Sequence, residues 1–339
     1  MSSVDIGIDL GTANTIITIG GKGIVINEPS VVAYDKKKKR VLAVGTDAYK
    51  MIGRTPEYIV AVKPLKDGVI SDNETTEAMV AAFIKKVSSS MMLKPRIILC
   101  VPSSVTDVEN RAVVEAALSA GARKVFIIKE PIAALLGAGI DISKAKGAMV
   151  VDIGGGTTDI AVASFNGIVQ DTSIKIAGNK FDDTIIKHIS AKYKILIGEK
   201  TAEQAKMQLA NVFDPDEKKR MIIKGRNLIK GLPESLEISE IDIYEAVMDL
   251  VEEITVGIKS VLERTPPELV GDILASGIIL TGGGALLGGL DKYIQKQIGA
   301  PCYVADDPLK CVARGVEAAF SLSEELMDGF EKISIYRYK

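Results

Sequence analysis

The chain has 339 residues, of which 47% are hydrophobic and 25% charged, and its formal net charge is −2. This length exceeds what one hydrophobic core usually serves, so we expect two lobes of roughly 150 to 180 residues. The balanced charge excludes a general nucleic-acid binder. Cys100, Cys302 and Cys311 are too few and too unevenly spaced for a disulfide framework, and no metal-ligand spacing surrounds His188. Residues 1–4 lack the features of a signal peptide, so a reducing cytoplasm fits best.

The first half of the sequence predicts a β-meander followed by alternating helices and strands. β-rich runs occupy residues 4–10, 14–20 and 23–27, joined by short links that contain glycine. A helix at 74–87, a strand at 97–101, a helix at 107–120, a strand at 125–128 and a helix at 131–138 follow. Residues 31–66 form a small insert, in which the basic run 36–40 is expected at a hairpin tip in water, with a lipid or filament role as the alternative.

The second half predicts the same plan again. A meander over 147–177 leads to a helix at 180–193, a helix at 201–211 and short strands around 220–240. A long helix at 242–263, a strand at 277–280, a helix at 285–298, a strand at 302–305 and a helix from 309 to about 321 complete it. Glycines interrupt the uncharged run 273–290, so we expect strand, turn and helix there rather than a membrane span.

These patterns predict an α/β fold of two duplicated lobes, each a β-meander plus a βαβ core, with a nucleotide cleft between them. We expect the core of lobe I at 1–32, 66–145 and 312–339, with an insert at 33–65. We expect the core of lobe II at 146–178 and 242–311, with an insert at 179–241.

The most informative feature is a motif that occurs twice. An apolar strand, an Asp, a Gly/Thr turn and a second apolar strand occur around Asp9 and again, 143 positions later, around Asp152. A glycine-rich turn lets backbone N–H groups converge on an anion. An Asp just before the turn suits a hydrated Mg²⁺ that bridges phosphates. Two such hairpins facing each other would clamp a nucleoside polyphosphate, whereas the alternative is two ordinary tight turns.

Two further segments could complete a nucleotide site. The turn Gly282, Gly283, Gly284, Ala285 follows a strand and precedes a predicted helix, where backbone donors face a ligand. Glu203 and Lys206 stand at i and i+3 on one helix face, where they could flank a ribose and an adenine ring. The alternatives are close packing at the glycines and a solvated ion pair on the helix.

The order of these motifs resembles the actin superfamily, and within it the chain is similar to the bacterial MreB/Mbl family over nearly its whole length. The stretches that carry the likeness to this family are residues 5–15, 27–32, 64–70, 197–203 and 264–269. The resemblance implies an actin-like ATPase fold. It also implies ATP or ADP and Mg²⁺ as ligands.

The resemblance assigns roles to individual residues. It implies phosphate contacts at Gly11, Thr12, Ala13, Asn14, Gly154, Gly155 and Gly156, adenosine contacts at Glu203, Gln204, Ala205, Lys206, Gly282, Gly283, Gly284 and Ala285, and Mg²⁺ held through water by Asp9 and Asp152. It also implies that Glu130 activates the attacking water and that Thr157 helps to position it. A loose phosphoryl-transfer transition state needs little more than such positioning. The first turn holds no Lys and the phosphate motifs hold no Arg, so we expect slow turnover. Lys129 departs from the family pattern, and a cation there is expected to lower the pKa of Glu130.

Three apolar residues, Met91, Met92 and Leu93, stand in a polar loop followed by cations, at the position of the family's membrane-inserting loop. Each could contribute about 1 to 3 kcal/mol when buried in a bilayer interface. The alternative is that they cap a helix end against the core. The tail at 332–339 mixes cations with aromatic residues, which suits an anionic lipid surface or a partner, or else a frayed end.

The resemblance implies a filament-forming cytoskeletal protein that determines cell shape and hydrolyses ATP slowly. The expected partners are other copies, in antiparallel double filaments, an anionic membrane surface at the inner face of the cell membrane, and membrane proteins of the cell-shape machinery. In a wall-less cell, helical shape and motility would replace the guidance of wall synthesis. A small-molecule kinase would need a dedicated Asp base, and a chaperone would need a substrate domain after the ATPase.

Overall fold

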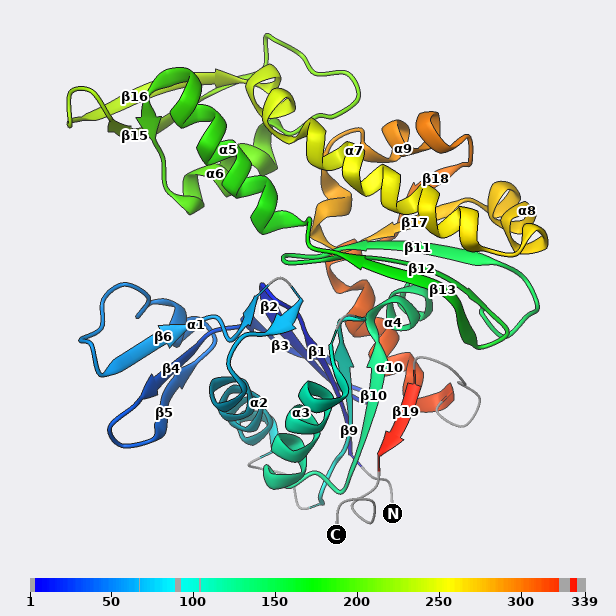
Figure 1. Cartoon of the computed structure of the whole chain (residues 1–339). Helices are drawn as coiled ribbons and strands as arrows, with labels where there is room; N and C mark the ends of the chain where they lie inside the picture. The colour runs from blue at the N-terminus through cyan, green and yellow to red at the C-terminus, as the bar shows by residue number, and fades with distance from the viewer. Residues whose placement is uncertain (1–3, 67, 89–92, 104, 323–329, 334–339) are drawn as a thin grey trace.

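A computed structural model describes residues 4–66, 68–88, 93–103, 105–322 and 330–333. Two lobes, each built on a β-sheet, lie one above the other with helices α4 and α10 between the sheets (Figure 1). The α/β class and the duplicated plan predicted from the sequence are confirmed. Of the helices in these residues, none is both long and apolar enough to cross a membrane.

The core of lobe I is a six-stranded sheet in the order β19-β10-β9-β1-β2-β3. The antiparallel meander pairs β1 with β2 and β2 with β3, whereas β1, β9 and β10 run parallel. Two helices, α2 and α3, pack against one another and belong to this lobe. The elements are β1 (Asp5–Leu10), β2 (Asn14–Ile19), β3 (Gly23–Pro29), α2 (Asn73–Ser88), β9 (Arg96–Val101), α3 (Asp107–Ser119), β10 (Lys124–Lys129), α4 (Glu130–Gly137), α10 (Cys311–Leu322) and β19 (Phe330–Ile333).

The core of lobe II repeats this order as β13-β12-β11-β17-β18. Its meander is antiparallel, and β11, β17 and β18 run parallel, as β1, β9 and β10 do. The elements are β11 (Ala148–Ile153), β12 (Thr158–Ser164), β13 (Gly167–Ile174), α7 (Glu240–Arg264), α8 (Pro267–Ser276), β17 (Ile278–Thr281), η1 (Gly283–Leu286), α9 (Leu290–Ile298), β18 (Cys302–Val304) and η2 (Pro308–Lys310).

Each lobe carries an insert with its own small sheet. The lobe I insert holds β4 (Val32–Asp35), β5 (Arg40–Val44), α1 (Thr46–Tyr49) and β6 (Ile59–Val62), followed by the pair β7 (Leu65–Lys66) and β8 (Val69–Ile70). The lobe II insert holds α5 (Gly178–Tyr193), β14 (Ile195–Leu196), α6 (Glu199–Leu209), β15 (Arg220–Asn227) and β16 (Pro233–Ser239). The basic run 36–40 forms the exposed tip of the β4–β5 hairpin, as predicted.

A hydrophobic cluster at the junction joins the two sheets. It combines Ile98 and Ile128 of lobe I, Val150 and Ala161 of lobe II, and side chains of α4 and α10. The two helices pack so closely that a Cβ on Gly315 would lie 1.7 Å from the carbonyl oxygen of Ala133. The contact between α4 and α10 therefore lies at the junction of the two lobes.

The structure corrects two predicted helices and adds two elements that were not predicted. The helix expected at 285–298 is a 3-10 turn followed by α9, because Gly289 adopts a left-handed φ of 73° between them. The helix expected from 309 is a second 3-10 turn before α10. Helix α8, which has Pro at its first position, was missed, as was β19, which pairs antiparallel with β10. The first part of the tail is thus in a strand, while residues 334–339 lie outside the described residues.

Candidate nucleotide site between the lobes

The two predicted turns face each other where the meanders of the two lobes meet. A Cβ on Gly155 would lie 2.8 Å from the Cβ of Ala13, so the second turn touches the first. The hydroxyl of Ser30, which follows β3, donates to the Gly11 carbonyl of the first turn at 2.5 Å. Within the second, Gly154 N–H donates to the Thr157 carbonyl at 2.9 Å. The close approach requires glycine at position 155, because any side chain there would separate the turns.

The third turn closes the site from the lobe II side. Gly282 has a φ of +78°, and a Cβ there would lie 2.4 Å from the Ile153 carbonyl oxygen. On the opposite wall, the ammonium of Lys206 on α6 lies 2.9 Å from the Asp182 carboxylate and donates to the Gly178 carbonyl at 3.0 Å. Lys206 therefore forms its ion pair with Asp182 on α5 and not with Glu203 on its own helix. The alternative of a solvated ion pair between Glu203 and Lys206 on α6 is thus wrong.

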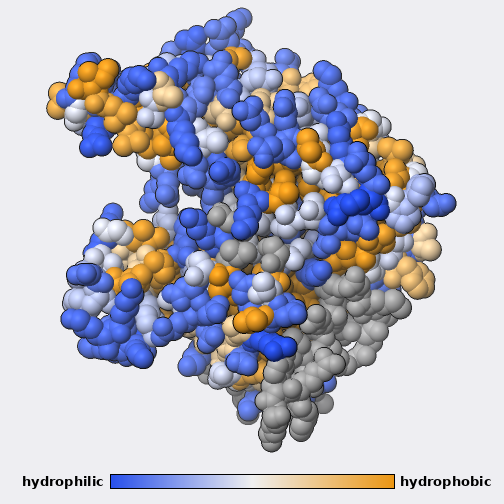
Figure 2. Space-filling model, in the orientation of Figure 1, coloured by the Kyte–Doolittle hydropathy of each residue, from blue (hydrophilic) through white to orange (hydrophobic). Residues whose placement is uncertain are grey.

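A cavity of about 460 Å³ lies between these segments. Figure 2 shows that the molecule is hollowed between the two inserts on this side. Nearly all the predicted residues line the cavity: Asp9, Gly11, Thr12, Ala13, Asn14, Glu130, Asp152, Gly154, Gly155, Gly156, Thr157, Glu203, Lys206, Gly282, Gly283 and Gly284. Gln204, Ala205 and Ala285 are not among the lining residues, since Gln204 is exposed and the two alanines are buried. The volume and the mixed polar lining suit a small organic ligand.

Four carboxyl groups meet at the base of the cavity. Burial, and then the charge of Asp152, raises the pKa of Asp9 to about 7. Burial likewise raises the pKa of Asp152 to about 7, although the Thr281 hydroxyl donates to its Oδ1 at 2.8 Å. The pKa of Glu130 lies well above its usual value because of burial and the charges of Asp159, Asp152 and Asp9. Such a cluster of buried carboxylates favours a cationic ligand over an empty cavity.

The expected effect of Lys129 on Glu130 is wrong. The Lys129 ammonium lies 3.6 Å from the Asp171 carboxylate, so it is paired with β13. The pKa of Glu130 is raised rather than lowered, because burial and three neighbouring carboxylates act on it. Because the pKa of Glu130 is not lowered, the argument that Lys129 makes Glu130 a weak base no longer holds.

Three functional candidates were missed by the sequence analysis. Thr281 holds Asp152, Asp182 holds Lys206, and Asp159 lies fully buried beside Glu130. Asp159 stands directly opposite Asp152 in the β11–β12 pair. The sequence did hold a signal for Asp159: in the second hairpin, both strands carry an Asp close to the turn, and such residues face each other across a strand pair.

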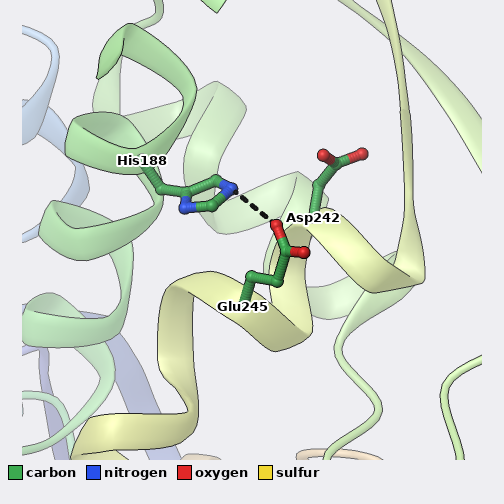
Figure 3. Close-up of side chains that lie close together, drawn as sticks. All are labelled: His188, Asp242 and Glu245. Atoms are coloured by element: carbon green, nitrogen blue, oxygen red, sulfur yellow. Dashed lines mark ion pairs between the residues drawn. The ribbon is translucent and has the colours of Figure 1, made fainter. Parts of the chain in front are cut away.

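A second polar cluster lies outside the cavity, between α5 and α7 (Figure 3). His188 Nε2 lies 3.5 Å from a Glu245 carboxylate oxygen, and a ligand atom of Asp242 is within 4.8 Å of both. The sequence shows no metal-ligand spacing around His188, and these two neighbours come from a helix more than 50 positions away along the chain. Lys192 already contacts Asp242 at 2.9 Å and Glu245 at 2.8 Å, and Asp242 also forms a capping box with Ser239 at the start of α7. These contacts make the cluster a tether between two helices.

The predicted membrane residues are only partly described. Met91 and Met92 lie outside the described residues, and Leu93 is 43% exposed. Cys100, Cys302 and Cys311 are free thiols in buried positions, as expected from their spacing.

Comparison with known proteins agrees with this geometry. The family model described as MreB/Mbl protein matches residues 3–327. The cell shape-determining protein Mbl of Bacillus subtilis (strain 168) is 51% identical over 316 residues, which cover 93% of this chain and 95% of that protein. The cell shape-determining protein MreB of Escherichia coli (strain K12) is 49% identical over 321 residues, which cover 93% and 92%.

Solved structures show the same fold. The crystal structure of MreB5 of Spiroplasma citri bound to ADP has a TM-score of 0.88 and 40% identity, and covers 95% of this chain and 98% of that one. The MamK double helical filament, at 23% identity, has a TM-score of 0.79 over 96% of this chain and all of the other, which supports the fold alone. The cavity, its paired turns and this level of identity lead to one conclusion: the chain belongs to the MreB/Mbl family of bacterial actin-like proteins.

Proposed function

We propose that the chain is an ATP-dependent, filament-forming cytoskeletal protein that determines cell shape and hydrolyses ATP slowly. The observation that carries this proposal is the cavity in which two glycine-rich hairpins face each other above a buried carboxylate cluster. A related structure with ADP and another with AMPPNP, both of MreB5 of Spiroplasma citri at 40% identity, support a nucleotide in this cavity.

The walls of the cavity suit the separate parts of ATP. Backbone N–H groups of the turns at 11–14 and 154–156 would bind the β- and γ-phosphates, except that of Gly154, which already donates to the Thr157 carbonyl. The adenosine would lie between α6 and the turn at 282–284, beside Glu203 and Lys206. The ion pair of Lys206 with Asp182 fixes that wall to α5.

We propose that Glu130 orients the attacking water. It is the first residue of α4, lines the cavity and is 7% exposed, and Thr157 lines the cavity from the β11–β12 turn. In hydrolysis the water oxygen bonds to the γ-phosphorus, the bond from that phosphorus to the bridging oxygen breaks, and the water proton passes to Glu130. No Lys or Arg stands in either phosphate turn, which is why we propose slow turnover.

The donor set at the base of the cavity fits Mg²⁺. Asp9 and Asp152 enter from facing lobes, and each carries a carboxyl whose ionisation is opposed by burial and by neighbouring acids. We propose that they hold Mg²⁺ through its water ligands. When bound, the ion supplies positive charge for the phosphates, while Thr281 keeps the Asp152 carboxylate oriented.

Self-assembly requires surface that a second copy can cover. The turn between β15 and β16 exposes Leu228, Ile229 and Leu232, with Ile229 80% exposed. Asn227 Oδ1 accepts from the N–H groups of Ile229 and Lys230 at 2.8 and 2.9 Å, so the turn is held in one shape. Figure 2 shows apolar residues at this end of the lobe II insert. We propose this tip as a contact between copies, in antiparallel double filaments.

The proposal extends to a position at the inner face of the cell membrane. The loop with Met91, Met92 and Leu93 would contribute weakly in one subunit, and a filament that displays many copies would bind an anionic surface well. Membrane proteins of the cell-shape machinery would be its further partners. In a wall-less cell the same filament would serve helical shape and motility.

Ultracentrifugation of the purified protein tests this function. The protein is pelleted with Mg-ATP, with Mg-ADP and without nucleotide, each with and without anionic liposomes, and the pellets are imaged by negative-stain electron microscopy. Paired straight filaments that are enriched on lipid support the proposal. A protein that binds ATP but stays monomeric under every condition contradicts it.

A further inference from the structure

A second cavity, of about 430 Å³, lies in lobe I, apart from the nucleotide cavity. It lies between the small sheet of the lobe I insert and the start of α2, and α2 packs against β4 and β5 (Figure 1). Its walls include Val60 and Val62 of β6 and the hydroxyl-bearing Ser71 and Thr75. None of its lining residues lines the nucleotide cavity, so a ligand in this place would be a second one.

Three lysines bring positive charge to this second cavity. Lys36 and Lys39 stand in the β4–β5 tip, and Lys63 follows β6. Within the part of the chain that the structure describes, the ammonium groups of these three lysines have no ion-pair partner, whereas Lys50 of the same insert pairs with Asp47 at 3.0 Å. The three cations are therefore available to a ligand.

The two acids of the lining already have donors. Glu74 accepts from the Tyr34 hydroxyl at 2.8 Å, and Asp72 accepts from the Thr75 N–H at 3.3 Å at the start of α2. The lining thus carries three cations against two anions. The cations come from the tip and from the end of β6, whereas both acids come from the α2 side. A ligand with an anionic end and a hydroxyl-bearing end would match both sides.

The tip holds its lysines in one arrangement. Asp35 Oδ1 accepts from the N–H groups of Lys37 and Lys38 at 3.0 Å each. Lys39 has a φ of 47°, in the left-handed region that favours Gly or Asn. A Lys in this position costs backbone free energy that a Gly would not. What the Lys adds is an ammonium group beside the cavity.

We propose that this cavity binds a phosphate group joined to a polyol, as in a soluble glycerol phosphate or in a lipid head group of the same chemistry. The phosphate oxygens accept from Lys36, Lys39 and Lys63, and the polyol hydroxyls donate to Asp72 and Glu74. A phosphate monoester carries a charge of about −1.5 to −2 at pH 7, which three ammonium groups can balance. The proposal does not depend on the nucleotide cavity or on the proposed function.

Protection of the lysines from reductive methylation tests the site. The protein is kept in excess Mg-ADP, which would fill the nucleotide cavity, and the methylation rate of each lysine is measured by mass spectrometry. Glycerol phosphate and vesicles of phosphatidylglycerol in phosphatidylcholine are added separately, with vesicles of phosphatidylcholine alone as the blank. At a probe concentration of about twice the dissociation constant, we expect Lys36, Lys39 and Lys63 to react about threefold more slowly and Lys50 to react as before.

The two probes distinguish the sources of the ligand. Protection by glycerol phosphate supports the site and assigns a soluble ligand to it. Protection by the phosphatidylglycerol vesicles alone supports the site and assigns a lipid head group. Equal protection of Lys50, or no protection of the three lysines by either probe, would overturn the proposal.

The variant Lys39→Gly separates ligand binding from folding. Because Gly adopts a φ of 47° freely, the Tm of the variant should be no lower than that of the parent protein. Its affinity for the probe that gives protection, followed at Lys36 and Lys63, should fall about tenfold. Lys50→Gln removes the same charge elsewhere in the insert and should bind the probe as the parent does. A Lys39→Gly protein with the affinity of the parent would also overturn the proposal.

Discussion

At the residue scale, the carboxylates of the cavity are the groups to which we assign the chemistry, and their burial costs stability. Asp9, Asp152, Asp159 and Glu130 come from four elements. Burial raises the pKa of each, and repulsion from neighbouring acids raises it further at Asp9, Asp152 and Glu130. A folded protein that gathers such groups is less stable at neutral pH than it would be without them. A bound cation therefore explains why these four carboxyl groups lie together, whereas a contribution to the stability of the fold does not.

Replacement of Glu130 by Ala tests the base. The variant is expected to bind ATP as the parent does, since Glu130 contributes no predicted phosphate contact, and to lose phosphate release by about 100-fold or more. Phosphate release is measured under saturating Mg-ATP, with nucleotide affinity measured separately. Glu115→Ala, at an exposed position on α3, is the control. Unchanged release in Glu130→Ala would remove this residue from its role.

The pKa shifts predict how stability varies with pH. In the folded, nucleotide-free protein Asp9 and Asp152 keep their protons up to about pH 7, whereas in the unfolded chain they lose them near 3.8. The native state binds more protons in this interval, so the free energy of unfolding falls as the pH rises through it. We expect the Tm of the nucleotide-free protein to decrease from about pH 4 to about pH 7 and to level off above that.

The double variant Asp9→Asn, Asp152→Asn is the comparison for this pH series. It removes both titrations, so its Tm should change less over the same interval. An equally steep decrease in the double variant would assign the pH dependence to other groups.

Element scale: the junction between the lobes depends on two helices without room for side chains at their contact. A Cβ on Gly315 of α10 would lie 1.7 Å from the Ala133 carbonyl oxygen, and a Cβ on Gly137 of α4 would lie 1.7 Å from that of Cys311. Because α4 begins at Glu130, this contact also determines where the base stands.

Gly315→Ala is expected to destabilise the protein by about 1 to 3 kcal/mol or more, since the added methyl group must displace backbone. The loss appears as a lower Tm or a lower denaturant midpoint. Gly271→Ala on α8 is a matched control, because a Cβ there meets nothing within 4 Å. The control should raise stability by about 0.5 to 1 kcal/mol. Equal Tm values for Gly315→Ala and the parent protein would contradict the close contact.

Whole-molecule scale: two surfaces far apart in sequence would determine assembly. The tip at 228–232 presents an apolar surface on the lobe II insert, and the segment around Leu93 lies in lobe I. Both matter only in a polymer, because a single copy of either gains little free energy from burial.

Ile229→Asp is expected to raise the critical concentration for assembly about tenfold or more, because a buried Ile contributes about 1.5 to 3 kcal/mol. Pelleting over a series of protein concentrations measures it. Lys230→Gln changes the neighbouring polar residue and should assemble as the parent does. Normal assembly of Ile229→Asp would place the contact between copies elsewhere.

Replacement of Met92 and Leu93 by Ser is expected to abolish co-pelleting with anionic liposomes while ATP binding stays unchanged, since the variant lacks the apolar side chains that we propose enter the bilayer. Leu42→Ser and Ile52→Ser, at exposed positions of the lobe I insert, give a variant with the same loss of apolar surface. If the Met92 and Leu93 variant pellets with liposomes as the parent does, the membrane contact must lie in another part of the chain.

The sequence by itself determined the duplicated α/β plan, the two glycine turns and the family, because glycine turns and strand periods are local signals that both halves repeat. Only the tertiary structure decided that Asp159 is fully buried, that Lys129 pairs with Asp171 and Lys206 with Asp182, and that His188 meets Asp242 and Glu245. It also decided that a 3-10 turn and Gly289 replace the start of one predicted helix, and that β19 joins the sheet. These features depend on contacts between segments distant in the chain, and such contacts leave no period in the sequence.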